Sequence, residues 1–105
     1  MTLEAQARAA LKRGDLPAAA AAAQSLVANN PDRAAGYFLL GIAAAEAGQI
    51  VKAVPLIEAA LERDPQAEHL AHLAKLLILL RRDGEAADAA DRAVALAPED
   101  RKSVV

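Results

Sequence analysis

Glycine and proline recur at a nearly fixed interval along this chain, and that interval constrains the fold more than any other feature. Gly14 and Gly48 are 34 positions apart, Pro31 and Pro65 are also 34 apart, and Pro98 follows 33 positions later. A period of this length is typical of proteins that stack one supersecondary unit on the next. The sequence therefore predicts three successive copies of one unit.

The composition predicts that these units are helical. Hydrophobic residues make up 55% of the chain but aromatic residues only 2%, and alanine supplies much of the apolar fraction. Alanine is the strongest helix former, and no stretch alternates apolar and polar residues as a half-buried strand would. We therefore predict an all-α chain.

Turn-forming and capping residues mark where the helices begin and end. Gly14 and Gly48 are predicted to end helices, because glycine adopts the left-handed conformation at low cost. Asp15, Asn30 and Asp64 are predicted N-caps. Asn30 and Asp64 are each followed by a proline, which suits a first helical position. The predicted helices lie near 3–13, 17–29, 32–47, 51–63, 67–81 and 84–97.

Pro55 fits this scheme less simply. If its helix begins at Val51, Pro55 lies at the edge of the first turn, where a missing N–H is only just tolerated. The sequence leaves two interpretations, a distorted first turn or a helix that begins one or two residues later.

Side-chain patterns also repeat from unit to unit. The first helix of the second unit has a large-large-small-small pattern at Tyr37, Leu40, Gly41 and Ala44. The same spacing recurs 33 residues later, at Leu70, Leu73, Ala74 and Leu77. Second-helix positions align as Ala19, Ala53 and Ala86, then Ala23, Ile57 and Ala90, then Val27, Leu61 and Val94. Small residues at Gly41, Ala53 and Ala60 predict a close approach of paired helices.

These residues resemble the tetratricopeptide repeat. Residues 34–67 match its pattern best, at Tyr37, Leu40-Gly41, Gly48, Ala53, Ile57, Ala60 and Pro65. In the third unit Arg81 stands where the mid-repeat glycine is expected, and Gly84 comes slightly later. The expected organisation is a single domain with repeats at 1–33, 34–66 and 67–100 and a tail at 101–105.

The resemblance implies a superhelical array of three antiparallel helical hairpins, an α-solenoid that needs its neighbours to bury each hairpin. In such an array the first helix of each hairpin lines a concave groove that binds peptides or partner helices. Carried over to this chain, the groove positions fall on Arg8, Lys12, Phe38, Leu39, Ile42, His72, Lys75 and Ile78.

The 32–47 helix supports a binding role without the family. Phe38, Ile42 and Ala45 form a second apolar stripe on this helix, beside the stripe that contains Tyr37 and Leu40. A helix that is apolar on two faces is expected to be covered on both. Neighbouring hairpins or a partner could cover the second stripe, and the sequence leaves both open. Arg8, Lys12 and Lys75 either attract an acidic segment or form a solvated surface.

Several function classes are disfavoured. The net charge is −2 and no basic stripe is present, so nucleic-acid binding is not expected. The chain has no cysteine, residues 1–12 do not resemble a signal peptide, and the apolar run at 76–80 is far below the roughly 18–20 residues of a membrane span. A cytoplasmic protein without membrane contact is expected.

Chemistry-bearing residues give only weak signals. Glu68, His69 and His72 share one helical turn and could touch a metal, but two surface histidines are the expected interpretation. The acidic residues of the last helix, at Asp83, Glu85, Asp88 and Asp91, are expected to be solvated. No phosphate-binding loop or nucleophile motif is present, so no enzyme activity, metal or cofactor is predicted.

The leading hypothesis is therefore a protein-interaction scaffold that binds a peptide or helix in its groove. Repeat arrays usually end in a polar capping helix, which the segment around Ser103-Val104-Val105 does not provide. Two alternatives follow: self-association of the array through its uncapped last hairpin into a homo-oligomer, or a docking or regulatory segment of a larger, enzymatic bacterial protein.

Overall fold

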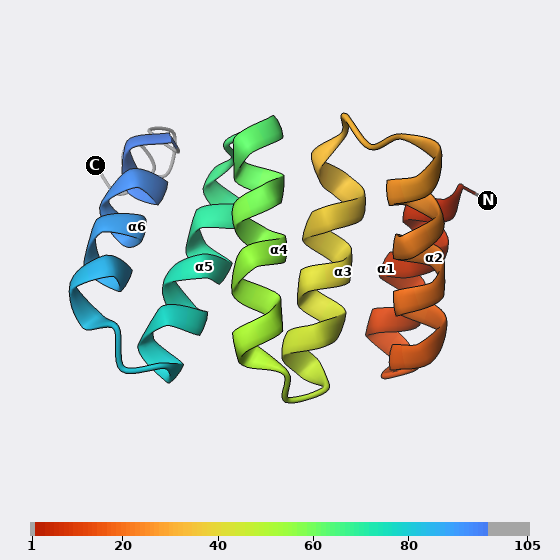
Figure 1. The fold of residues 1–105 in the computed structure, drawn as a ribbon, viewed down its shortest axis with the longest axis horizontal. Helices are drawn as coiled ribbons and strands as arrows, with labels where there is room; N and C mark the ends of the chain where they lie inside the picture. Colours follow the sequence, from red (N-terminus) through yellow and green to blue (C-terminus); the bar gives the residue numbers. More distant parts are fainter. Residues whose placement is uncertain (1, 97–105) are drawn as a thin grey trace, which may run out of the picture.

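The computed structural model describes residues 2–96. Over this range the chain forms six α-helices and no strand, which confirms the all-α prediction: α1 Leu3–Arg13, α2 Leu16–Asn29, α3 Ala34–Glu46, α4 Ile50–Arg63, α5 Ala67–Leu79 and α6 Asp83–Leu96. Consecutive helices pair as antiparallel hairpins that follow one another along the longest axis, with α4 between α3 and α5 (Figure 1). The predicted tail at 101–105 lies outside the described residues.

The first hairpin has capping residues at both helices, and those at Gly14 and Asp15 were predicted. Thr2 caps α1 by accepting a hydrogen bond from the Ala5 N–H at 3.1 Å, and Gly14 ends the helix in the left-handed conformation at φ 77°. Asp15 then caps α2 by accepting from the Ala18 N–H at 3.3 Å. These residues satisfy N–H groups that the first turn of a helix leaves without partners.

The predicted N-caps of α3 and α5 are wrong. Asn30 and Asp64 instead end the preceding helices, with φ −141° and −157°. Both residues precede a proline, which disfavours helical backbone at the residue before it, so α2 and α4 end at these positions. α3 therefore begins after Arg33, later than predicted, whereas α5 begins at Ala67 as predicted, after Gln66. Neither Arg33 nor Gln66 makes a side-chain cap bond.

Pro55 lies inside α4. The helix begins at Ile50, one residue earlier than expected, so the suggestion of a later start is wrong. Proline cannot donate a hydrogen bond to the carbonyl of Val51, four residues before it. Val51 is 74% exposed and Pro55 is exposed as well, so water can reach this side of the helix.

The turn of the third hairpin uses a residue that is not glycine. Gly48 has φ 86° in the turn between α3 and α4, while Arg81 adopts φ 64° in the turn between α5 and α6. Gly84 lies inside α6 and takes no part in this turn. The register of the repeat is thus kept in the third hairpin, although its glycine is displaced.

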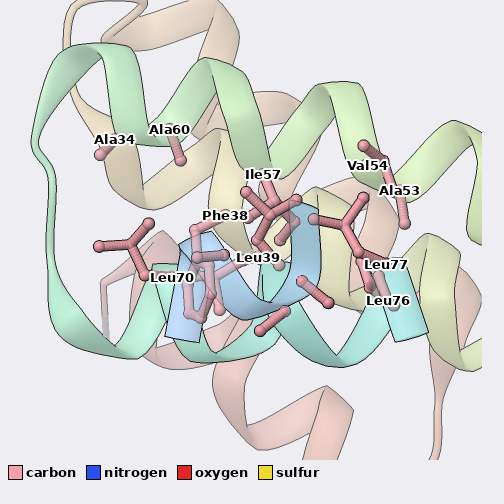
Figure 2. Close-up of a cluster of buried hydrophobic side chains, with 14 of the residues drawn as sticks. Ala34, Phe38, Leu39, Ala53, Val54, Ile57, Ala60, Leu70, Leu76 and Leu77 are labelled. Atoms are coloured by element: carbon pink, nitrogen blue, oxygen red, sulfur yellow. The ribbon is translucent and has the colours of Figure 1, made fainter. Parts of the chain in front are cut away.

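The main core lies where α3, α4 and α5 meet (Figure 2). Ala53, Ile57 and Ala60 of α4 are each 0% exposed, as the small-residue pattern predicted. Gly41 is buried against Ile57, and a Cβ at this position would lie 2.8 Å from the Ile57 Cδ1. The predicted close approach of α3 and α4 is therefore confirmed.

Arg63, the last residue of α4, ties the middle hairpin to the preceding connection. Its Nε donates to the Pro31 carbonyl at 2.7 Å, and its two terminal nitrogens donate to the Ala59 carbonyl at 2.9 Å and to the Tyr37 hydroxyl at 3.2 Å. The guanidinium carbon also lies 4.1 Å from the centre of the Tyr37 ring. A planar cation of this kind both donates hydrogen bonds and stacks on an aromatic face.

Candidate partner-binding groove

A small open pocket lies between α3, α4 and α5. Its volume is about 140 Å³ and its wall is mainly apolar. We call it the groove pocket; it is lined by Gly41, Ile42, Ala45, Glu46, Ile50, Ile57, His72, Lys75, Leu76 and Leu79. Three residues of the predicted groove set, Ile42, His72 and Lys75, come together here.

Phe38 and Leu39 lie beneath this surface rather than on it. Each is 1% exposed, so neither side chain is available to a partner in this conformation, contrary to their expected place in the groove. The first turns of α5 cover Phe38, whose ring stacks on His69 with 4.1 Å between ring centres. The sequence left open whether neighbouring hairpins or a partner cover the second apolar stripe of this helix. In the structure neighbouring helices cover Phe38, whereas Ile42 stays half-exposed in the pocket wall.

The remaining predicted residues lie outside the groove pocket. Arg8 forms an ion pair with Glu4 at 3.3 Å and lines a separate polar pocket near the start of α3 and α5. Lys12 is exposed and Ile78 is 56% exposed, and neither lines the groove pocket. The structure thus divides the predicted set between the groove pocket, the core beneath it and the exposed surface.

Sequence reasoning missed Leu79 and Glu46, which complete the pocket wall. Leu79 follows His72 and Lys75 at intervals of seven and four residues, which places all three on one face of α5. That spacing could have identified Leu79 from the sequence. In the structure this large apolar side chain is 59% exposed. Glu46, at the end of α3, carried no comparable signal.

Charges of both signs surround the pocket. Lys75 of α5 and Glu46 of α3 both lie in its wall. Burial lowers the pKa of His72 below its ordinary value, with an added lowering from Lys75, while Glu68 and Glu46 act in the opposite direction. The imidazole is therefore neutral at neutral pH and can serve as donor or acceptor beside an apolar surface.

The expectation of two surface histidines is wrong for His69, which is 3% exposed. It faces Phe38 because the helical register that places Leu70 and Leu73 in the core also turns His69 towards α3. Within residues 2–96 no three His, Cys, Asp or Glu side chains are arranged to hold a metal ion. In the same range, no helix is long and apolar enough to cross a membrane.

The six helices of residues 2–96, a repeat near 34 residues and a pocket on the first-helix face define a helical-repeat protein. The family model of the tetratricopeptide repeat matches residues 4–68 and 47–101. The chain therefore belongs to the tetratricopeptide repeat family. A search of curated proteins finds no match.

Solved structures share the fold. The MamA RS-1 ArsTM double mutant superposes with a TM-score of 0.82 at 23% identity, over 90% of this chain and 53% of that one. MamA 41-end from Desulfovibrio magneticus RS-1 gives 0.81 at 23% identity, over 89% and 53%. TTC0263, a thermophilic TPR protein in Thermus thermophilus, gives 0.55 at 22% identity, over 95% and 75%. The chain spans about half the length of the MamA chains, and at these identities the likeness concerns the fold.

Proposed function

We propose that this chain is a protein-interaction module that binds an apolar side chain of a partner peptide or helix in the groove pocket. The supporting observation is the pocket itself: an open apolar hollow between α3 and α5, continued by the exposed Leu79. Burying a large aliphatic side chain contributes about 1.5–3 kcal/mol, and a helix laid in such a groove supplies one every three or four residues.

The charges at the pocket restrict the partner further. Lys75 and Glu46 stand on α5 and α3, on either side of the pocket. A partner segment fits best with a Leu, Ile or Met anchor that has an acidic residue towards Lys75 and a basic residue towards Glu46. Such rim charges contribute more to orientation and association rate than to affinity.

A peptide-display selection tests this proposal. Peptides enriched on the wild-type chain are expected to carry an aliphatic anchor and to lose at least tenfold in affinity on Ile42→Glu and on Leu79→Glu, since each change places a charge at the apolar wall. Val51→Glu is the matched control, because Val51 is 74% exposed and lies outside the pocket. The proposal would be contradicted if Ile42→Glu and Leu79→Glu bound the peptides as tightly as the wild-type chain and Val51→Glu do.

Self-association is a second candidate, supported by the outer face of α6. Val94 is 48% exposed, and Ala87 and Ala90, which share its face of the helix, are exposed as well. In stacked arrays this is the face on which a further hairpin packs. Analytical ultracentrifugation should show a dimer that Val94→Glu dissociates, and a strict monomer at high concentration would rule this candidate out.

A further inference from the structure

Three rings join the middle hairpin to the third. The Phe38 ring of α3 stacks on His69 of α5, with 4.1 Å between centres and 27° between planes. The same ring meets His72 edge-on at 5.2 Å and 69°. The sequence contains one phenylalanine and two histidines, so this contact uses all of them. We call it the three-ring contact.

His69 occupies a site that favours a neutral ring over a charged one. It is 3% exposed, and its Nδ1 is buried without a hydrogen-bond partner. An imidazolium carries an N–H on both nitrogens and a full charge, so protonation would leave the buried Nδ1–H unpaired and a charge that is largely shielded from water. The face of Phe38 would attract the cation, but burial of the charge is the larger effect.

Charged groups from several elements face His69. Glu68 and Asp64, together with the Asp64 backbone carbonyl, favour the protonated ring, and His72 disfavours it. The polar pocket at its edge adds both signs from α1 and the connection before α3, through Glu4, Arg8, Asp32 and Arg33. Burial outweighs the favourable carboxylates, so the pKa of His69 lies below its ordinary value of 6.5.

We propose that the three-ring contact is a pH-sensitive latch that holds α5 against α3 at neutral pH and releases the third hairpin when His69 takes up a proton. Because the folded state binds this proton less readily than the unfolded state, the stabilisation is complete above pH 6.5. It is lost as the pH falls from there towards the lower pKa of the folded state. The third hairpin packs on the rest of the array mainly through the contact of α5 with α4, so it opens first.

Opening would also dismantle one wall of the groove pocket. Leu76 and Leu79 belong to α5, while Ile42 belongs to α3. Release of α5 separates these walls, so partner binding weakens over the same pH range. This consequence rests on the proposed function, whereas the latch does not.

The latch is tested on the free chain by two measurements. NMR titration of the two histidine side chains should show His69 titrating below 6.5. The second measurement is amide hydrogen exchange, corrected for its intrinsic pH dependence. The exchange rates in α5 and α6 should rise by up to about tenfold per pH unit below 6.5, which is the limit for the uptake of one proton. The amides of α1 and α2 should stay protected.

Variants separate His69 from other causes. His69→Phe keeps a ring on Phe38 but cannot titrate, so it should abolish the acid-induced exchange of α5 and α6, whereas His72→Gln should retain it. Titration of wild-type His69 at or above 6.5, or an equal rise in exchange in all six described helices, would overturn the latch. Acid-induced opening of α5 with no loss of binding by the selected peptides would count against the proposed function and leave the latch in place.

Discussion

The second and third hairpins follow one plan but join their neighbours by different means. α3 approaches the first hairpin at Gly36, where a Cβ would lie 2.8 Å from the Val27 Cγ2 and 2.9 Å from the Val27 backbone nitrogen. α5 approaches α3 through rings, with Phe38 between His69 and His72. One junction depends on the absence of a side chain, the other on the presence of large ones.

The hollows beside the two junctions also differ. An open, mainly apolar hollow of about 410 Å³ lies between α2, α3 and α4, and Gly36 does not line it. At the other junction the groove pocket, of about 140 Å³, opens beside His72 at the edge of the ring cluster. The third hairpin also departs from the second at its turn, where Arg81 replaces glycine in the left-handed conformation.

Phe38→Ala should have the largest effect on this comparison. It removes the ring on which α5 rests, and deletion of a buried aromatic costs about 3–5 kcal/mol. Urea unfolding followed by circular dichroism measures the loss, with Phe38→Leu as a milder control. A loss below about 1 kcal/mol would show that the junction does not depend on this ring.

Gly36→Ala should break the other junction. The added methyl group meets the Val27 backbone, which cannot rotate away, and overpacking of this kind costs about 1–3 kcal/mol. Gly41→Ala is the matched control, because its closest contact is the Ile57 Cδ1, the end of a flexible side chain. We expect a smaller loss for Gly41→Ala in the same unfolding assay, and the reverse order would contradict this account.

Arg81→Gly should make the third turn resemble the second. A left-handed residue other than glycine carries strain of about 1–2 kcal/mol, part of which is offset by the greater freedom of glycine in the unfolded chain. The expected result is a gain of about 1 kcal/mol in unfolding free energy. Gly48→Ala, at φ 86°, should lose stability in the same experiment.

Gly84→Ala should give the smallest change, a gain of about 0.5–1 kcal/mol from helix propensity. A Cβ at this position meets no atom within 4 Å, and the residue lies in the first turn of α6. Thermal unfolding is sensitive enough to detect the gain. A loss instead would indicate that glycine has a conformational role at the start of α6.

Features set by neighbouring residues were predictable from the sequence, while those set by competition or distance were not. The turns at Gly14 and Gly48 follow from local conformational preference. The N-caps of α3 and α5 were misplaced because a capping residue before proline suits both the end of one helix and the start of the next, and Asn30 and Asp64 end α2 and α4.

The candidate site divides in the same way. Helical spacing and family resemblance brought Ile42, His72 and Lys75 to one pocket, although their role in binding stays a prediction. The burial of Phe38 depends on the separation of α3 and α5. Side chains of two hairpins together set the separation of α3 and α5. The burial of Phe38 could therefore not be predicted from the sequence of one helix.

The Arg63 contact makes the middle hairpin visible by optical spectroscopy. Tyr37 is the one tyrosine in the sequence, tryptophan is absent, and the Arg63 guanidinium lies 4.1 Å from the Tyr37 ring centre. Intrinsic fluorescence therefore reports on this hairpin alone, whereas the two histidine resonances report on the third. Without any label, the chain carries separate reporters for two neighbouring repeats, and the order in which they melt can be read directly.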